Sequence, residues 1–295
     1  MPQGKFGGRH TITKLGIVEE YLDAYTHVLK NSGLSTVYFD AFAGTGDLNI
    51  DASPLLGEVE DVREFAAGSA RRALRIEIPF ERYVFNELKQ ANVVELEALR
   101  EEFPLLAPRI SIVRKDANEA LLEFCDWLDH KPQYRAVIFL DPFGNEVKWT
   151  TISRIARTKR TDLWYLFPVG LGIGRQIGRD GAVLPEHGQS IDELLGTTQW
   201  RSALVAPTQI VQADMFVEDQ VNSVQRATAD QITQYVIGRM KTEFAGGVLD
   251  VWIPLGRGRA HWYSLLFAWA NPRATDIAKR IAGHLIRRAR HGRPF

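Results

Sequence analysis

Short apolar segments alternate with segments of helical spacing between residues 36 and 167 of this 295-residue chain. The predicted strands cover 36–40, 82–86, 110–114, 136–140 and 162–167, and the predicted helices between them cover 88–103, 117–129 and 149–158. Parallel neighbouring strands need a long crossover connection, which is usually a helix. The alternation therefore predicts an α/β fold built from βαβ units, with a mostly parallel, doubly wound sheet.

The segments on either side of this alternation complete the expected architecture. On the N-terminal side we expect a helix over 11–31, and between the first two strands an insertion over 47–68 and a helix over 70–76 capped by Ser69. After the last parallel strand we expect an irregular or helical insertion over about 169–245, which contains a long polar helix over 217–244. Two apolar strands over 248–254 and 261–270 then form an antiparallel hairpin, and a helix over 273–290 follows. No repeat and no Pro/Ser-rich linker divides the chain, so we expect one domain over 1–295.

Composition limits the class of protein. Hydrophobic residues make up 45% and charged residues 24%, which is ordinary for a globular protein. No apolar run approaches the ~20 residues of a membrane span, and the first residues lack the apolar core of a signal peptide. We therefore expect a cytoplasmic protein without membrane contact. The single cysteine, Cys125, excludes an internal disulfide, and the seven histidines show no H-x-x-x-H spacing, so no metal site is predicted.

Charge is balanced over the whole chain, with 36 basic and 36 acidic residues, but it is segregated along it. The segment 271–295 carries seven Lys/Arg and one Asp, and 154–179 carries six Lys/Arg and one Asp. Such segments, together with Arg257 and Arg259, are suited to contact phosphates of a nucleic acid. The alternative is that they are simply solvated.

Polar or Gly-rich residues follow the predicted strands at the edge where doubly wound sheets bind ligands. The first strand ends in Asp40-Ala-Phe-Ala-Gly-Thr-Gly46, where Gly44 and Gly46 allow close approach of a ligand to the backbone. Glu87 follows the second strand, in the place of a residue that binds a ribose diol, and Asp116, beside Ala117, follows the third. Each carboxylate alone is as well explained by a solvated strand end or a helix cap. In chain order they form an adenosine-binding pattern.

These segments resemble a class I S-adenosylmethionine (SAM)-dependent methyltransferase, and more narrowly the three-Cys-motif partner (TcmP) family. The similar segments are Thr13-Lys-Leu, Tyr21-Leu-x-x-Tyr25, Phe39 to Gly46, Gly68-Ser-Ala, Asp141-Pro-Phe-Gly144 with Trp149, Asp162-Leu-Trp to Pro168, and Gly196-Thr to Trp200. Two departures are Ala70, where proline is expected, and His10, where tryptophan is commoner. The family is named for a companion that resembles radical-SAM enzymes and carries the three-cysteine motif, which this chain lacks.

The resemblance implies a Rossmann-like fold with strand order 3-2-1-4-5-7-6 and SAM as the cofactor. The residues it places at the cofactor are Lys14, Asp40, Phe42, Ala43, Gly44, Gly46, Glu87, Asp116 and Ala117.

The sequence Asp141-Pro-Phe-Gly144 is similar to the Asp/Asn-Pro-Pro-Tyr/Phe motif of enzymes that methylate amino groups of bases. There, the carboxylate or amide and the first proline carbonyl accept hydrogen bonds from the exocyclic amine, and the aromatic ring stacks on an unpaired base. Asp141, Pro142 and Phe143 are therefore the candidate catalytic residues, although Phe143 stands where the motif has its second proline. The alternative is a proline turn that ends a buried strand, with Phe143 in the core.

Three functions follow as hypotheses. The first is a SAM-dependent methyltransferase acting on an exocyclic amino group of an RNA or DNA base. The second is a protein of SAM-binding fold that binds or regulates a radical-SAM-like companion without methyl transfer. The third is a methyltransferase for a small molecule or a protein.

Overall fold

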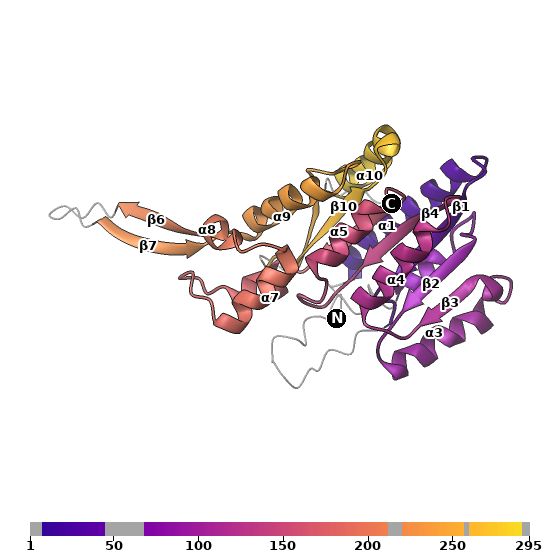
Figure 1. Ribbon diagram of the computed structural model, residues 1–295, viewed down its shortest axis with the longest axis horizontal. Helices are drawn as coiled ribbons and strands as arrows, with labels where there is room; N and C mark the ends of the chain where they lie inside the picture. The colour runs from indigo at the N-terminus through magenta and orange to yellow at the C-terminus, as the bar shows by residue number, and fades with distance from the viewer. Residues whose placement is uncertain (1–7, 45–67, 212–219, 257–259, 291–295) are drawn as a thin grey trace, which may run out of the picture.

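The computed structural model describes residues 8–44, 68–211, 220–256 and 260–290, and for 8–15, 206–211 and 220–224 it describes the backbone alone. The insertion expected over 47–68, the residues Gly46, Arg257 and Arg259, and the side chain of Lys14 therefore lie outside the described part. Figure 1 shows a sheet with helices on both faces and a two-stranded arm at one end.

The central sheet has the order β3-β2-β1-β4-β5-β10-β8, and β9 also pairs with β10. Its strands are β1 (Ser35–Asp40), β2 (Arg82–Asn86), β3 (Ile110–Val113), β4 (Tyr134–Leu140), β5 (Thr161–Phe167), β8 (Gly247–Val248), β9 (Ile253–Leu255) and β10 (Tyr263–Trp269). The first five are parallel, and β10 runs antiparallel to β5, β8 and β9. The predicted class I methyltransferase-like topology is confirmed, with the sixth strand split into β8 and β9.

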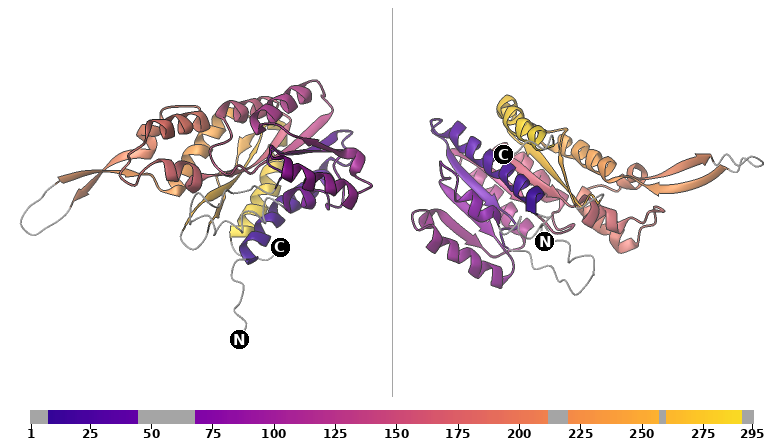
Figure 2. Two further views of the ribbon diagram at one scale, coloured as in Figure 1. Left: turned by 90° about the horizontal axis from the view of Figure 1, so that it is seen from below. Right: turned by 180° about the vertical axis from the view of Figure 1, so that it is seen from behind.

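Two helical layers cover the sheet. One face packs against α4 (Ala117–Asp129), α5 (Trp149–Arg157), α7 (Pro185–Leu195) and α9 (Ala229–Glu243). The other packs against α1 (Gly8–Leu29), α3 (Gln90–Glu102), α10 (Thr275–Arg290) and the helical residues 68–73. Helices α1 and α10 lie side by side (Figure 2). No helix in the described ranges is both long and apolar enough to cross a membrane.

The strand registers determine which side chains share a face. Asp40 of β1 lies beside Phe139 of β4, and side chains alternate between faces along a strand. Asp141, two residues beyond Phe139, therefore projects to the same face as Asp40. This is the face covered by α1 and α10, because Phe139 packs in that core.

The helix predicted over 217–244 is wrong for its first part. Residues Gln220–Arg226 form β7, which pairs antiparallel with β6 (Val205–Val211), and the two strands project from the body as an arm next to the short helix α8 (Trp200–Leu204) (Figure 1). Val221 and Val224 are three residues apart, a helical spacing, but here their backbone hydrogen bonds are made with β6. We call Val205–Val211 and Gln220–Arg226 the β6–β7 arm.

Helix α9 begins after Thr228 because that residue forms a capping box with Gln231. The Thr228 hydroxyl accepts a hydrogen bond from the Gln231 backbone N–H, and the Gln231 side chain accepts one from the Thr228 backbone N–H. Two N–H groups that the first helical turn leaves unpaired are thereby satisfied.

We predict that Thr228→Ala lowers the free energy of unfolding by about 1 kcal/mol, the usual contribution of an N-cap hydroxyl. Urea denaturation monitored by circular dichroism measures it. Thr242→Ala, near the exposed C-terminal end of the same helix, is the control and should change the stability by less than about 0.5 kcal/mol. Equal effects of the two substitutions would contradict a helix start at Thr228.

Candidate functional site

The carboxyl ends of β1, β2 and β4 lie together at one edge of the sheet. Asn86, at the end of β2, connects the loop after β1 with the loop after β3. Its side-chain amide donates to the carbonyl oxygens of Ala41 (3.0 Å) and Lys115 (3.2 Å), while its backbone carbonyl accepts from the N–H of Ala43 (2.9 Å). Asn86 is buried. The amide of one strand end therefore fixes the loops that follow β1 and β3, a role that local sequence patterns do not indicate.

Gly44 lies directly against Glu87. A Cβ atom at Gly44 would overlap the Glu87 carboxylate and lie 2.7 Å from the Cβ of Asn92. The glycine is therefore needed so that the loop can approach this carboxylate, and not only so that a ligand can approach the loop. Glu87 is half-buried, and its Oε1 accepts from the N–H of Lys89 at 2.7 Å.

Asp40 is completely buried at the end of β1. Its Oδ2 accepts hydrogen bonds from the hydroxyls of Ser69 (2.7 Å) and Tyr38 (3.4 Å), and its Oδ1 accepts from the N–H of Phe42 (3.2 Å). Burial raises the pKa of Asp40 to about 6, with a smaller contribution from the charge of Glu87, although the three hydrogen bonds oppose this. Ser69, expected as a helix cap, instead lies inside the helical residues 68–73 and donates to this carboxylate.

Asp141 is buried at the end of β4, and its Oδ2 has no hydrogen-bond partner among the described residues. Burial raises the pKa of Asp141 well above its usual range, and the charges of Asp40 and Glu146 raise it further. A buried carboxylate oxygen without a donor is costly, so in a native structure it calls for an explanation. A ligand with an N–H or O–H group would supply the missing donor to Asp141 Oδ2.

The loop after Asp141 holds Phe143 out of the core. The side chain of Phe143 is 37% exposed. Its N–H donates to Glu146 Oε2 (2.7 Å), and its carbonyl accepts from the hydroxyl of Tyr263 on β10 (3.1 Å). The alternative that places Phe143 in the core is therefore wrong, whereas Pro142 is buried. An exposed aromatic ring therefore follows the Asp141 strand end by two residues.

Asn118 of α4 fixes the far end of the same loop. Its side-chain amide donates to the carbonyl of Glu146 (2.9 Å), and its Oδ1 accepts from the N–H of Lys148 (2.9 Å) and the hydroxyl of Thr151 (2.8 Å). All these partners belong to the chain itself, so Asn118 acts as a positioning residue.

The remaining predicted cofactor residues take different places. The Asp116 carboxylate caps α4 by accepting from the N–H groups of Asn118 (2.9 Å) and Glu119 (3.3 Å), and in the described ranges it contacts neither Asp40 nor Glu87. Ala117 is buried in the first turn of α4. Ala43 is buried and Phe42 half-buried in the loop after β1. Asp116 is therefore a helix cap, which was the alternative to a ligand contact. Both N–H groups donate to its Oδ1, so Oδ2 of this exposed residue is left for other contacts.

The basic segments do not form one continuous surface at this site. Arg154 pairs with Asp126 (2.8 Å) and Asp129 (2.6 Å), and Arg160 donates to the carbonyl of Leu128 (2.8 Å), all at the opposite edge of the sheet, where β5 begins. In contrast, Arg287 and Arg290 lie in the last turn of α10. Helix α10 packs antiparallel to α1, so the C-terminal end of α10 points toward the first half of α1.

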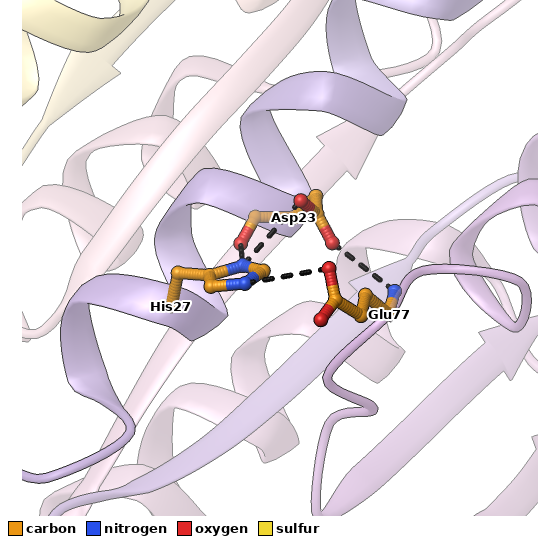
Figure 3. A group of neighbouring side chains, drawn as sticks. All are labelled: Asp23, His27 and Glu77. Atoms are coloured by element: carbon orange, nitrogen blue, oxygen red, sulfur yellow. Dashed lines mark hydrogen bonds and ion pairs between the residues drawn. The ribbon is translucent and has the colours of Figure 1, made fainter.

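Three groups with metal-ligand atoms, Asp23, His27 and Glu77, lie close together on the outside of α1 (Figure 3). His27 Nδ1 lies 2.9 Å from the carbonyl oxygen of Asp23, and Asp23 Oδ1 accepts from the N–H of Glu77 (3.1 Å). Asp23 and His27 are spaced as Asp-x-x-x-His, a pattern that H-x-x-x-H spacing does not include. The group is exposed or half-exposed and separate from the strand ends of the candidate site.

Several solved structures are similar to this chain at low sequence identity. A protein of Legionella pneumophila is 12% identical over 95% of this chain and 92% of that chain, with a TM-score of 0.40. Magnesium protoporphyrin IX methyltransferase of Synechocystis PCC 6803, with bound SAH, is 11% identical over 91% and 89%, with a TM-score of 0.35. A putative methyltransferase of Escherichia coli is 15% identical over 57% and 74%, with a TM-score of 0.27.

No protein-family model matches the sequence, and no curated protein matches it. At this level of similarity, the function has to be inferred from the residues of the site.

We predict that Asp40 makes the protein less stable as the pH rises. Because its folded-state pKa of about 6 exceeds the ordinary value of 3.8, the folded protein binds the proton more tightly than the unfolded chain. Its stabilising contribution is present below about pH 4 and is lost as the pH rises to about 6. Two pKa units correspond to about 3 kcal/mol.

Urea denaturation between pH 4.5 and 8 measures this effect. Asp40→Asn should remove about 2–3 kcal/mol of the decline in unfolding free energy seen for the wild type, since the amide keeps the acceptor for Ser69 and does not titrate. Parallel profiles for the two proteins would show that Asp40 does not hold a proton in the folded state.

Proposed function

We propose that this protein is a SAM-dependent methyltransferase that binds its cofactor at the ends of β1 and β2 and its acceptor at the end of β4. The observation that carries the proposal is the buried Asp141 carboxylate, whose Oδ2 has no partner in the described ranges, beside the buried Asp40. Both stand at the edge where doubly wound sheets bind ligands.

The described residues fit this cofactor. SAM carries a sulfonium cation, and the carboxylates of Asp40 and Glu87 at this edge of the sheet favour a cation. Glu87 would accept hydrogen bonds from the ribose hydroxyls, and the backbone from Ala41 to Gly44 would face the methionine part. The resemblance adds Lys14, Phe42, Gly46, Asp116 and Ala117 as further contacts. When bound, SAM supplies a methyl group activated on sulfur.

Asp141 would orient the acceptor. In its ionised form the carboxylate accepts an N–H of an amino group and turns the nitrogen lone pair toward the reacting carbon, while the Pro142 carbonyl accepts the second N–H. Catalysis of this kind consists mainly of positioning two reactants. Exposed beside this carboxylate, Phe143 offers a face on which a planar base stacks.

An amino group of an RNA or DNA base is the acceptor class that these residues favour. An unpaired base presents both a planar ring for Phe143 and an exocyclic amine for Asp141. At the C-terminal end of α10, Arg287 and Arg290 are exposed, and a phosphate backbone is the partner expected for such residues. Methyl transfer to a small molecule or a protein is the competing outcome of the acceptor test below.

A second candidate function is that of a TcmP-like partner protein without methyl transfer. The β6–β7 arm favours it, because its two strands pair only with each other and project from the body (Figure 1). A two-stranded ribbon alone is marginal in water, so a partner that covers it would stabilise it. The partner would be the radical-SAM-like companion with the three-cysteine motif.

Calorimetric titration with SAM distinguishes the two functions, and Glu87→Ala tests the cofactor placement. We predict that SAM binds, and that Glu87→Ala weakens binding by about 1.5–3 kcal/mol because hydrogen bonds to a charged group are lost. Glu101→Ala, an exposed carboxylate on α3, is the matched control and should leave the dissociation constant unchanged. No binding at millimolar SAM would exclude both methyltransferase hypotheses.

Transfer of label from [methyl-³H]SAM into RNA, DNA, protein and small-molecule fractions identifies the acceptor. With that acceptor, Asp141→Ala should remove most of the turnover with little change in SAM affinity, because the carboxylate contacts the acceptor. Asp141→Asn keeps a hydrogen-bond acceptor, so it should restore part of the turnover and abolish the loss of activity at low pH that the raised pKa of Asp141 predicts. Wild-type turnover in Asp141→Ala would refute this role.

Phe143→Ala tests the stacking role separately. Since Phe143 is exposed, its loss should leave the melting temperature nearly unchanged, but it should weaken acceptor binding by about 1–3 kcal/mol if the ring stacks on a base. A lower melting temperature with unchanged acceptor binding would instead assign Phe143 to structure.

A further inference from the structure

A cavity of about 150 Å³ lies at the edge of the sheet opposite the candidate site. It is enclosed by the C-terminal half of α1, the first residues of β4 and β5, and the first half of α10. Its polar wall contains Tyr21, Tyr25, Arg135, Arg160 and Asp162. None of these residues belongs to the proposed cofactor and acceptor sites.

Two arginines face this cavity without an acidic partner. Arg135 Nη1 donates to the carbonyls of Pro132 (2.9 Å) and Tyr134 (2.8 Å), and Arg160 Nη1 donates to the carbonyl of Leu128 (2.8 Å). Both are half-buried, and within the described ranges neither forms an ion pair. Burial lowers the pKa of Arg135, and the nearby charge of Arg160 adds to this. Two neighbouring, partly desolvated guanidinium groups are stabilised by an anion.

Asp162 does not supply that anion. Its Oδ2 accepts from the hydroxyl of Tyr21 at 2.6 Å, a contact that joins α1 to β5. Burial raises the pKa of Asp162 to about 7, although the Tyr21 hydrogen bond opposes this. Two guanidinium groups face one carboxyl group in this cavity, so its excess charge is positive.

The rest of the wall is apolar and curved around a small volume. Apart from Asn271, it consists of Val28, Leu29, Leu34, Ala274, Ile277, Ala278 and Ile281. An apolar cavity of about this size holds a benzene ring. The body of a ligand would thus be a single aromatic ring or a short branched chain.

We propose that this cavity is a binding site for a small organic carboxylate, with its anionic group at Arg135 and Arg160 and its apolar body between α1 and α10. The site is independent of the proposed methyl transfer, because it lies at the other edge of the sheet. A ligand there would bridge α1, β4, the start of β5 and α10, and would raise the melting temperature by binding the folded state alone.

Three probes of one shape and different charge test the proposal. Benzoate, benzyl alcohol and benzylamine are titrated into the full chain by calorimetry, with thermal melting in parallel. We expect benzoate to bind at least ten times more tightly than the other two, and to raise the melting temperature in a concentration-dependent way. Equal binding of all three, or no binding of benzoate, would overturn the proposal.

Substitutions locate the site. Arg135→Gln and Arg160→Gln should each weaken benzoate binding about tenfold or more, whereas Arg157→Gln, an exposed residue on α5 outside the cavity wall, should not. Ala274→Phe fills the cavity without changing its charge and should abolish benzoate binding. Melting curves without ligand establish that each variant folds. Benzoate binding unaffected by Ala274→Phe would place it elsewhere and contradict the assignment.

Discussion

The burial of two carboxylates at neighbouring strand ends is the constraint on which the candidate site depends. Asp40 and Asp141 project to the same face from adjacent parallel strands. Burial raises the pKa of both carboxyl groups, and the charge of Asp40 raises that of Asp141 further. The protein compensates Asp40 with three hydrogen bonds but leaves Asp141 Oδ2 without one in the described ranges. Buried charge of this kind destabilises a fold, and its retention at a ligand-binding edge is characteristic of functional sites.

The surrounding structure holds these groups in place. Asn86 connects the ends of three strands, Gly44 admits the Glu87 carboxylate against the first loop, and Tyr263 and Glu146 hold the Phe143 backbone on either side. Most of these contacts are made by side chains whose polar atoms are used within the chain. They explain why one edge of an ordinary doubly wound sheet presents both buried carboxyl groups and an exposed aromatic ring.

The local signals of the sequence predicted the parallel sheet well, because buried strands such as β4 are continuous apolar runs and their ends are marked by Asp40, Glu87 and Asp141. Contacts between distant residues were not predictable in this way. Ser69 reaches Asp40 across 29 positions, and Asp162 meets Tyr21 across 141. Only the β7 half of the arm was predicted to be helical, within 217–244, and its true strand pairing depends on β6, which the sequence pattern did not show. The Thr228 capping box marks the true start of the helix.

Hydrogen–deuterium exchange with and without SAM tests the central claim most directly, because it reports where the cofactor binds without knowledge of the acceptor. The account predicts slower exchange of backbone amides in 41–44 and 86–89 when SAM is added, with 141–146 less affected until an acceptor is present. Unchanged exchange in the first two segments, or protection confined to the α1–α10 edge around 271–281, would contradict the assignment of this strand edge to the cofactor.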